Sequence, residues 1–322
     1  SPVLSGNQLL LMGDTDVVIQ RMAEDIDEAR EHCHLLVYIY LDDHSGRRIA
    51  DALMRAARRG VTCRLLLDSL GSRSFLRSDT CRRLRAAGVH VVEAMPANLL
   101  RALFSRIDVR NHRKLMIVDG RIGYTGSQNI ANADFAPKRR YAPWVDAMVR
   151  MEGPVVRELQ TLFVEDWYLD TNESLAPLLA YTPPSRDHGS AVQVYATGPL
   201  LPPGATRTLL QAAMQMAREE LVLTTPYFVP DESLVTSLAT GARRGTVIRL
   251  IVPKRNDSLL VSLASRAYYT SLLEAGVEIV EFQNGLLHAK TLTIDRKLAI
   301  VTSANVDRRS FDLNFEAGIV VY

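Results

Sequence analysis

The sequence has few of the features of a disulfide-rich, membrane-spanning or nucleic-acid-coating protein. Its three cysteines, Cys33, Cys63 and Cys81, have neither paired spacing nor a nearby metal-ligand pattern, so we expect free thiols, with Cys33 and Cys63 buried. The longest apolar runs, such as Leu35 to Leu41, fall far short of the ~20 residues that a spanning helix needs. Basic and acidic residues nearly balance, at 38 and 36, and aromatic and basic residues do not alternate. We therefore expect no nucleic-acid partner.

The sequence does contain an internal repeat. In each half, strand-like runs alternate with amphipathic helices, and the helices end at equivalent glycines, Gly60 and Gly88 in the first half and Gly245 and Gly276 in the second. The predicted strands span 35–40, 61–67 and 89–92, then 221–227, 247–252 and 277–282.

This alternation predicts an α/β fold made of two tandem domains. We expect each to be a mixed, largely parallel sheet flanked by helices, with a pseudo-twofold relation and an active site at the interface. The segment 183–190 is polar and rich in proline and glycine, which is typical of a linker. The sequence thus predicts a first domain over 1–182 and a second over 191–322.

Each half carries the same polar signature near its end. His112 and Asn129 are 17 residues apart, as are His288 and Asn305. The full sets are His112, Lys114, Asp119, Ser127 and Asn129 in the first half, and His288, Lys290, Asp295, Ser303 and Asn305 in the second. A single His-x-Lys on a strand usually means little, but two copies at equal spacing in a repeat indicate a site.

Side chains two positions apart on a strand share a face, so each histidine and its lysine project together. The following hairpin brings the serine and asparagine of each set back beside them. Lysines, asparagines, Ser127 and Ser303 can bind the oxygens of a phosphodiester. One histidine can attack phosphorus, while the other exchanges protons with the alcohols. Because lysines supply the positive charge, we expect no metal ion and no cofactor.

A histidine nucleophile needs a carboxylate on its other ring nitrogen. Asp146 and Glu316 open similar strands just downstream of the two motifs, and we assign Asp146 to His112 and Glu316 to His288. Asp119 and Asp295 lie an odd number of positions from the histidines. We therefore expect structural roles for them in hairpin turns.

The arrangement His-x-Lys-x4-Asp-x6-Gly-Ser-x-Asn resembles the signature of the phospholipase D superfamily. The first half matches it at every fixed position, and the second departs only at Thr302, where glycine is usual. Further segments, among them 225–230, 305–310 and 314–316, look like those of bacterial cardiolipin synthases.

That resemblance implies an enzyme that transfers a phosphatidyl group from phosphatidylglycerol to a histidine, then to a second phosphatidylglycerol, with release of glycerol. It favours His112 as the nucleophile and His288 as the acid and base, although the two motifs are too alike for the sequence alone to rank them. The alternatives are a phosphodiesterase that hydrolyses phospholipid or nucleic acid, and a catalytically inactive membrane-binding module.

A lipid substrate requires access to a membrane. The segment from Leu99 to Arg110 mixes apolar and basic residues, and we expect Arg101, Leu103, Phe104 and Arg106 to contact an anionic bilayer. An ordinary amphipathic segment packed on its own domain is an equally good interpretation. The expected location is the bacterial inner membrane, reached peripherally or through an anchor outside this sequence.

The repeat also suggests how the chain continues. The first half runs on from Glu152 into an amphipathic helix, whereas the equivalent position in the second half is Tyr322. We therefore expect the natural chain to extend past Tyr322, and apolar surface to lie open beside the strand 317–321.

Overall fold

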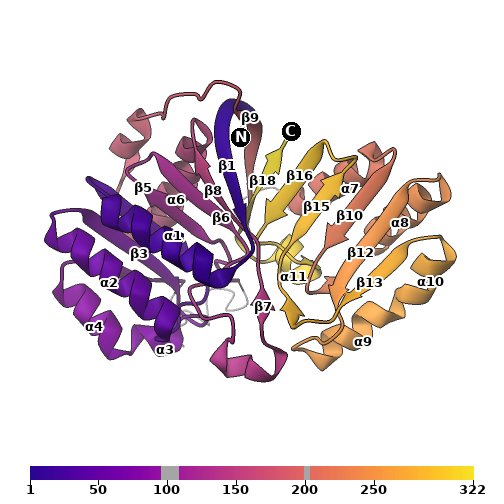
Figure 1. The fold of residues 1–322 in the computed structure, drawn as a ribbon, viewed down its shortest axis with the longest axis horizontal. Coiled ribbons are helices and arrows are strands. Elements are labelled where there is room, and N and C mark those ends of the chain that lie inside the picture. Colours follow the sequence, from indigo (N-terminus) through magenta and orange to yellow (C-terminus); the bar gives the residue numbers. More distant parts are fainter. Residues whose placement is uncertain (96–108, 199–203) are drawn as a thin grey trace.

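The computed structural model describes residues 1–95, 109–198 and 204–322. In these residues fourteen strands form one continuous mixed sheet (Figure 1). From its outer edge to the centre of the sheet, the first half has the strand order β4-β3-β2-β5-β6-β8-β1. From the centre to the other edge, the second half has the order β9-β18-β16-β15-β10-β12-β13, so equivalent strands follow one another in reverse order. The pseudo-symmetry predicted from the repeat is therefore present in the sheet.

The strands of the first half, in chain order, are β1 (Leu4–Met12), β2 (His32–Val37), β3 (Thr62–Asp68), β4 (His90–Ala94), β5 (Leu115–Val118), β6 (Ile122–Gly126) and β8 (Met148–Glu152). Those of the second half are β9 (Ser190–Thr197), β10 (Glu220–Thr224), β12 (Val247–Pro253), β13 (Glu278–Phe282), β15 (Thr291–Ile294), β16 (Leu298–Thr302) and β18 (Glu316–Val321). Two short strand pairs lie outside the sheet: β7 (Trp144–Val145) with β14 (Leu286–Leu287), and β11 (Phe228–Val229) with β17 (Val306–Asp307).

The sheet is mixed, as expected, but its parallel pairs are confined to the outer strands. β2, β3 and β4 are parallel, as are β10, β12 and β13. The strands nearer the centre pair antiparallel, because hairpins and returning connections join them. The parallel strands carry the helical crossovers, while the antiparallel strands carry the two motifs.

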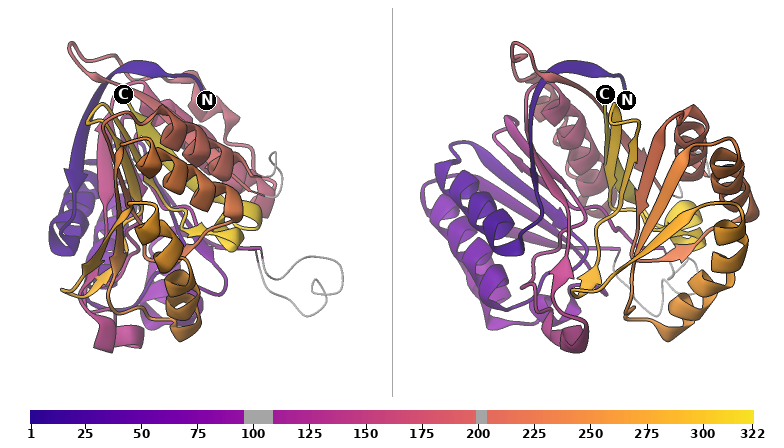
Figure 2. Two further views of the ribbon diagram at one scale, coloured as in Figure 1. Left: turned by 90° about the vertical axis from the view of Figure 1, so that its right-hand side faces the viewer. Right: turned by 45° about the vertical axis from the view of Figure 1, so that its right-hand side comes forward.

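Helices cover the outer face of each half-sheet and also lie between the two half-sheets. In the first half they are α1 (Thr15–Glu28), α2 (His44–Arg58), α3 (Arg73–Leu76), α4 (Asp79–Ala86) and α6 (Val155–Thr171), with the 3-10 helices η1 (Ala136–Tyr141) and η2 (Ala176–Ala180). In the second half they are α7 (Ala205–Met216), α8 (Glu232–Arg243), α9 (Leu259–Ala267), α10 (Tyr269–Glu274) and α11 (Arg308–Asp312). Figure 2 shows the half-sheets splayed apart, with α1, α2 and α4 outside one and α7, α8 and α10 outside the other.

The repeat extends to the signals that start and stop the helices. Asp43 caps α2 by accepting from the Gly46 amide at 3.0 Å, and Asp231 caps α8 by accepting from the Leu234 amide at 3.0 Å. After α2 and α8 the chain reaches Gly60 and Gly245, whose φ angles of 92° and 96° disfavour other residues. The same kinds of residue therefore begin and end the crossover helices α2 and α8.

Helix α6 packs against both halves. Its apolar side chains belong to one hydrophobic core with Ile117 and Val149 of the first half and Val192, Ala317 and Ile319 of the second. Val320, on the other face of β18, packs in the core formed with α7 and α8. The expectation of open apolar surface beside 317–321 is therefore wrong, because a helix of the first half covers it; residues 316–320 are all buried.

Two other sequence expectations can be compared with the structure. The three cysteines are free and buried, as expected. The segment 183–190 contains no helix or strand before Ser190, where β9 begins. However, β1 pairs with β9, so the two halves share one sheet. The division into domains at 183–190 remains a proposal.

Asp119 and Asp295 hold equivalent hairpin turns. Asp119 accepts from the amides of Arg30, Glu31 and His32 at 2.8–3.0 Å, and Asp295 accepts from the matching amides before β10. Both aspartates have positive φ, 52° and 50°, in turns that join β5 to β6 and β15 to β16. Their carboxylates tie each motif hairpin to the neighbouring parallel strand.

We predict that Asp119→Ala lowers the free energy of unfolding by about 2–4 kcal/mol, since three amides lose their acceptor and alanine disfavours positive φ. Asp119→Asn should cost less, because asparagine keeps one acceptor oxygen and tolerates this conformation. Urea denaturation measures both. The rate per folded molecule should be unchanged in either variant, and a large fall in that rate would contradict a purely structural role.

Candidate active site

The two motifs meet at one cavity between the halves. Its volume is about 600 Å³, and both halves line it. The motif residues in its wall are His112, Asn129, His288 and Asn305. The wall also includes side chains to which the sequence assigned no role, among them Tyr38, Trp144, Tyr227, Asp307, Arg309 and Asn314.

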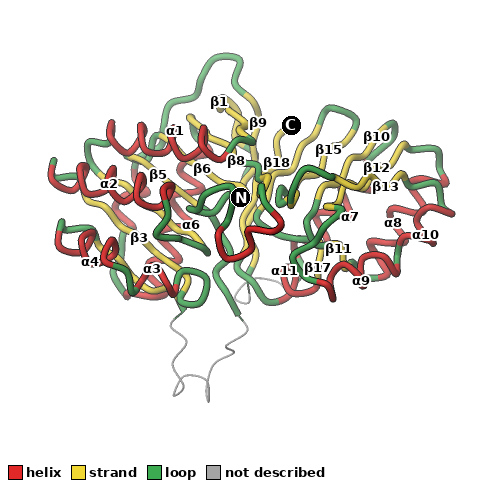
Figure 3. Tube along the Cα trace, turned by 60° about the horizontal axis from the view of Figure 1, so that its bottom comes forward, coloured by secondary structure: helices red, strands yellow, loops and turns green. Residues whose placement is uncertain are grey.

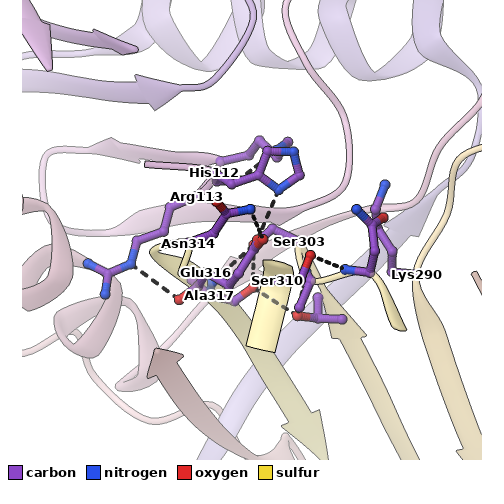
Figure 4. Close-up of polar contacts among 12 residues, drawn as sticks. His112, Arg113, Lys290, Ser303, Ser310, Asn314, Glu316 and Ala317 are labelled. Carbon is purple, nitrogen blue, oxygen red and sulfur yellow. Dashed lines mark hydrogen bonds and ion pairs between the residues drawn. The ribbon is translucent and has the colours of Figure 1, made fainter. Parts of the chain in front are cut away.

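Each histidine is held by a carboxylate from the opposite half. His112 Nδ1 lies 3.0 Å from Glu316 Oε2, and His288 Nδ1 lies 2.6 Å from Asp146 Oδ1. Both carboxylates are buried, and Figure 4 shows Glu316 at the centre of a set of polar contacts that includes His112 and Ser303. The assignment of Asp146 to His112 and of Glu316 to His288 is therefore wrong, and the pairs are crossed.

The crossing follows from strand pairing between the halves. β7 of the first half pairs with β14 of the second, and the His288 amide donates to the Val145 carbonyl at 2.7 Å. In the equivalent place, Asn111 bridges Phe315, and the His112 amide donates to the Phe315 carbonyl at 2.9 Å. Each carboxylate directly follows the segment that pairs with the other half's histidine, so it reaches that histidine.

Ser127 and Ser303 hold the carboxylates and do not line the cavity. Ser127 Oγ donates to Asp146 Oδ1 at 2.6 Å, and Ser303 Oγ donates to Glu316 Oε2. Both serines have no exposed surface. The expected phosphate contact is therefore wrong for these hydroxyls. The reason is that β6 pairs with β8, and β16 with β18, which sets each serine beside the carboxylate of its own half.

Glu316 and Asp146 are ionised at neutral pH. Burial alone would raise the pKa of Glu316, but His112 and Lys114 outweigh it and hold the pKa at about 2. The pKa of Asp146 is also lowered, because His288 and Lys290 outweigh the effect of burial. A charged carboxylate on Nδ1 favours the tautomer with hydrogen on Nδ1, so Nε2 of each ring is the nitrogen available to a substrate.

Both histidines are neutral near pH 7. Burial lowers the pKa of His112, with Glu316 opposing the shift. Burial and Lys290 lower the pKa of His288 to about 4. Aromatic rings fix the imidazoles as well, with Tyr38 at 4.9 Å from His112 and Trp144 at 4.7 Å from His288 between ring centroids.

The lysines lie beneath the histidines and are almost fully buried. Lys114 Nζ donates to the His112 carbonyl, and Lys290 Nζ to the His288 carbonyl, each at 2.6 Å. Burial lowers the pKa of Lys114 to about 8 and that of Lys290 to about 7, although the nearby carboxylates oppose the shift. The positive charges of the two ammonium groups thus balance the negative charges of the two carboxylates. An anionic substrate would bring one further negative charge into the site.

The polar environment differs between the two halves of the cavity. Asn129 Oδ1 accepts from the Ile39 amide at 3.2 Å. The equivalent Asn305 Oδ1 is buried without a partner among the described residues, as is Asn314 Oδ1. At the place equivalent to Asn314, the first half has Trp144. The second half thus has two buried amide oxygens without a hydrogen-bond partner among the described residues, whereas the first half has Trp144 and the hydrogen-bonded Asn129.

Arg113, between His112 and Lys114, connects the two halves. Its Nη1 lies 2.7 Å from Asp166 of α6, while Nε and Nη2 donate to the carbonyls of Glu316 and Thr197 at 3.2 and 3.1 Å. Sequence reasoning missed it because the motif leaves this position open, and the second half has Ala289 there. Its contacts position the backbone that carries Glu316.

The expected membrane segment can be described only in part. Arg101, Leu103, Phe104 and Arg106 lie outside the described residues. Arg110, at the end of that segment, is buried, and its Nη1 donates to Ser69 Oγ at 3.2 Å. Arg110 therefore does not face a bilayer, and the expectation for Arg101, Leu103, Phe104 and Arg106 stays a prediction.

Within the described ranges, 1–95, 109–198 and 204–322, no group of three or more histidines, cysteines, aspartates or glutamates is placed to bind a metal ion. Within the same ranges no helix combines the length and the apolar character needed to cross a bilayer.

A mixed sheet with two crossed histidine–carboxylate pairs defines a phospholipase D-like fold, and comparison with known proteins agrees. The family model "Cardiolipin synthase, PLD-like domain" matches residues 22–167 and 210–322. The chain belongs to this family. It is also similar to proteins named cardiolipin synthase A from Edwardsiella ictaluri and Yersinia pseudotuberculosis, at 41% identity over 99% of this chain. The chain spans 66% of the length of these relatives.

Solved structures support the fold at low sequence identity. A phosphatidylserine synthase from Haemophilus influenzae matches with a TM-score of 0.73 and 16% identity, covering 100% of this chain and 84% of that one. A polyphosphate kinase from Porphyromonas gingivalis matches with a TM-score of 0.61 and 17% identity, covering 98% of this chain and 44% of that one. At these identities, the likeness concerns the fold alone.

The crossed pairs predict which histidine each carboxylate controls. Glu316→Gln should lower the pKa of His112 further, because the charge that raises it is lost, while His288 changes little. Asp146→Asn, the matched control, should act on His288 instead. Titration followed by ¹⁵N NMR of labelled histidine measures both rings. A Glu316→Gln effect centred on His288 would contradict the crossed arrangement.

Proposed function

We propose that this protein is a phosphatidyltransferase of the cardiolipin synthase type. It transfers a phosphatidyl group from one phosphatidylglycerol to a second and releases glycerol. The observation that carries this proposal is the shared cavity, in which two imidazoles, each held at Nδ1 by a buried carboxylate, face one space above two lysines. Membership of the cardiolipin synthase family supports the choice of substrate.

In the first step, His112 Nε2 attacks phosphorus. A P–N bond forms, and the bond from phosphorus to the glycerol oxygen breaks. The lowered pKa of His112 keeps its Nε2 lone pair free at neutral pH, and Glu316 stabilises the cationic ring that develops. The sheet holds both in place before substrate binds, which limits reorganisation during the reaction.

His288 transfers the protons. It donates the Nε2 proton to the departing glycerol oxygen, then takes a proton from the hydroxyl of the second phosphatidylglycerol, which attacks phosphorus and breaks the P–N bond. The pKa of His288, about 4 in the empty site, is too low for an acid at neutral pH. A bound phosphodiester brings a negative charge that raises this pKa and so favours the protonated ring.

Lys114 and Lys290 place positive charge beneath the phosphate position, and Asn129 and Asn305 offer amide groups in the cavity wall. The developing charge on the phosphate oxygens would be stabilised by these groups. The proposed substrates require an anionic membrane, which we place at the bacterial inner membrane.

We predict that incubation with phosphatidylglycerol yields cardiolipin and glycerol, detected by lipid mass spectrometry. His112→Ala should lose at least about a thousandfold in rate while remaining folded. Phosphatidic acid as the only lipid product would favour the hydrolase alternative. No lipid product from folded protein would reject both enzymatic hypotheses.

Incubation of histidine variants with phosphatidylglycerol separates the roles of the two histidines. His288→Asn should accumulate a phosphatidyl adduct on His112, because removal of the base slows resolution. His112→Asn is the matched control and should form no adduct. Mass spectrometry of the intact protein and its peptides measures both, and an adduct on His288 in His112→Asn would reverse the assignment.

We also predict a fall in kcat/KM as pH rises through about 7 to 8. In this range the buried lysines, with pKa values of about 7 and about 8, lose the charge that binds phosphate. Because bound phosphate stabilises the charged lysines, the fall in kcat should lie at higher pH than the fall in kcat/KM. A short-chain soluble substrate is suitable, with circular dichroism as a check on folding. A kcat/KM that stays flat up to pH 9 would contradict the role of the lysines.

A further inference from the structure

Helix α9 carries the two most exposed large apolar side chains of the described residues, and a third exposed leucine. Leu259, Leu260 and Leu263 are 74%, 80% and 58% exposed. At helical spacing these three lie within one stripe, to which the exposed Ala267 also belongs. Leucines on one exposed stripe are costly in water, so the stripe needs a partner.

The stripe lies beside the mouth of the catalytic cavity. Ser258, the N-cap of α9, and Val261 within the helix both line that cavity. Figure 3 shows α9 next to β11 and β17. Val229 of β11 and Asp307 of β17 line the cavity. The N-terminal end of α9 therefore adjoins the cavity wall, although Val261 projects from a different side of the helix than the leucines.

The surface around the stripe is basic. Lys254 and Arg255 precede α9 and are exposed, as is Arg266 near its end. From the other half, η1 adds the exposed cations Lys138, Arg139 and Arg140. Lys138 forms an ion pair with Asp257, which joins η1 to the loop before α9, and the carboxylate of Asp257 is itself buried. Acidic groups on neighbouring elements are Asp134, 3.7 Å from Arg139, and the exposed Glu274 on α10.

We propose that the α9 patch, defined as Leu259, Leu260 and Leu263 with Lys254, Arg255 and Arg266, docks the protein on an anionic phospholipid bilayer. The leucines enter the acyl region, and the cations of the patch and of η1 contact lipid phosphates. The cavity mouth is thereby held at the lipid surface. This proposal rests on the proposed function, because a lipid substrate gives the patch its partner.

Charge and position favour a bilayer over a second protein. The cations surround the leucines on two elements from different halves of the chain, which suits a flat anionic surface. A lipid that leaves such a surface headgroup first would enter the cavity between α9 and η1, where Lys138 and Ser258 form part of the wall.

The experiment compares vesicle binding of the wild type and the triple variant Leu259→Ser/Leu260→Ser/Leu263→Ser. Vesicles contain equal parts of phosphatidylglycerol and phosphatidylcholine, with phosphatidylcholine alone as the neutral surface. The wild type should bind the anionic vesicles more tightly, and the triple variant should lose at least about tenfold in affinity. Reversal of Lys254 and Arg255 to glutamate should weaken binding to anionic vesicles and remove its salt dependence.

Leu10→Ser/Leu11→Ser is the matched control, because these leucines of β1 are 49% and 64% exposed and do not line the cavity. It should bind like the wild type. The wild type, the triple variant and the control should have equal rates on a short-chain soluble substrate. Equal rates show that both variants fold. Wild-type binding by the triple variant, or an equal loss in the control, would overturn the proposal. So would loss of a dimer, instead of vesicle binding, in the triple variant.

Binding and turnover separate the two proposals. Vesicle flotation requires no reaction, so normal flotation by a protein that forms no cardiolipin would count against the proposed reaction and support the patch. Cardiolipin formation with unchanged flotation in the triple variant would count against the patch alone.

Discussion

The site depends on the exchange of two short segments between the halves. Residues 143–145 pair with 286–288, and Phe315 pairs with the backbone beside His112. These contacts deliver Asp146 to His288 and Glu316 to His112. A carboxylate this deeply buried is costly unless it is paired and hydrogen-bonded, and here a histidine, a serine and nearby lysines meet that requirement. Neither half could therefore complete its own site alone.

The rest of the structure keeps that exchange in register. β1 and β9 join the half-sheets, α6 packs on both, and Arg113 links α6 to the strands that end at Thr197 and begin at Glu316. Asp119 and Asp295 tie each motif hairpin to its neighbouring strand. These contacts involve residues that do not line the cavity, yet they set where the imidazoles face.

The pseudo-symmetry is strict in the backbone and relaxed in the cavity wall. The sheet order, the helix caps and the hairpin aspartates repeat, and so do the histidine, lysine and serine contacts. Trp144 and Asn314, by contrast, occupy equivalent positions with different chemistry, and Asn305 lacks the partner that Asn129 has. Such differences give two similar histidines different surroundings. The exposed leucines of α9 also belong to the second half.

The sequence by itself determined the repeat, the α/β class, six strands of the sheet to within a few residues, and which histidines, lysines and asparagines gather at the site. Those features follow from local periodicity, from turn and capping residues, and from a motif with fixed spacing. Only the tertiary structure decided which carboxylate serves which histidine, where Ser127 and Ser303 donate, and what covers β18. Each of these depends on contacts between segments more than a hundred residues apart or on the pairing of neighbouring strands. Helical or strand periodicity describes one element at a time, so it carries no record of the partner that crosses from the other half.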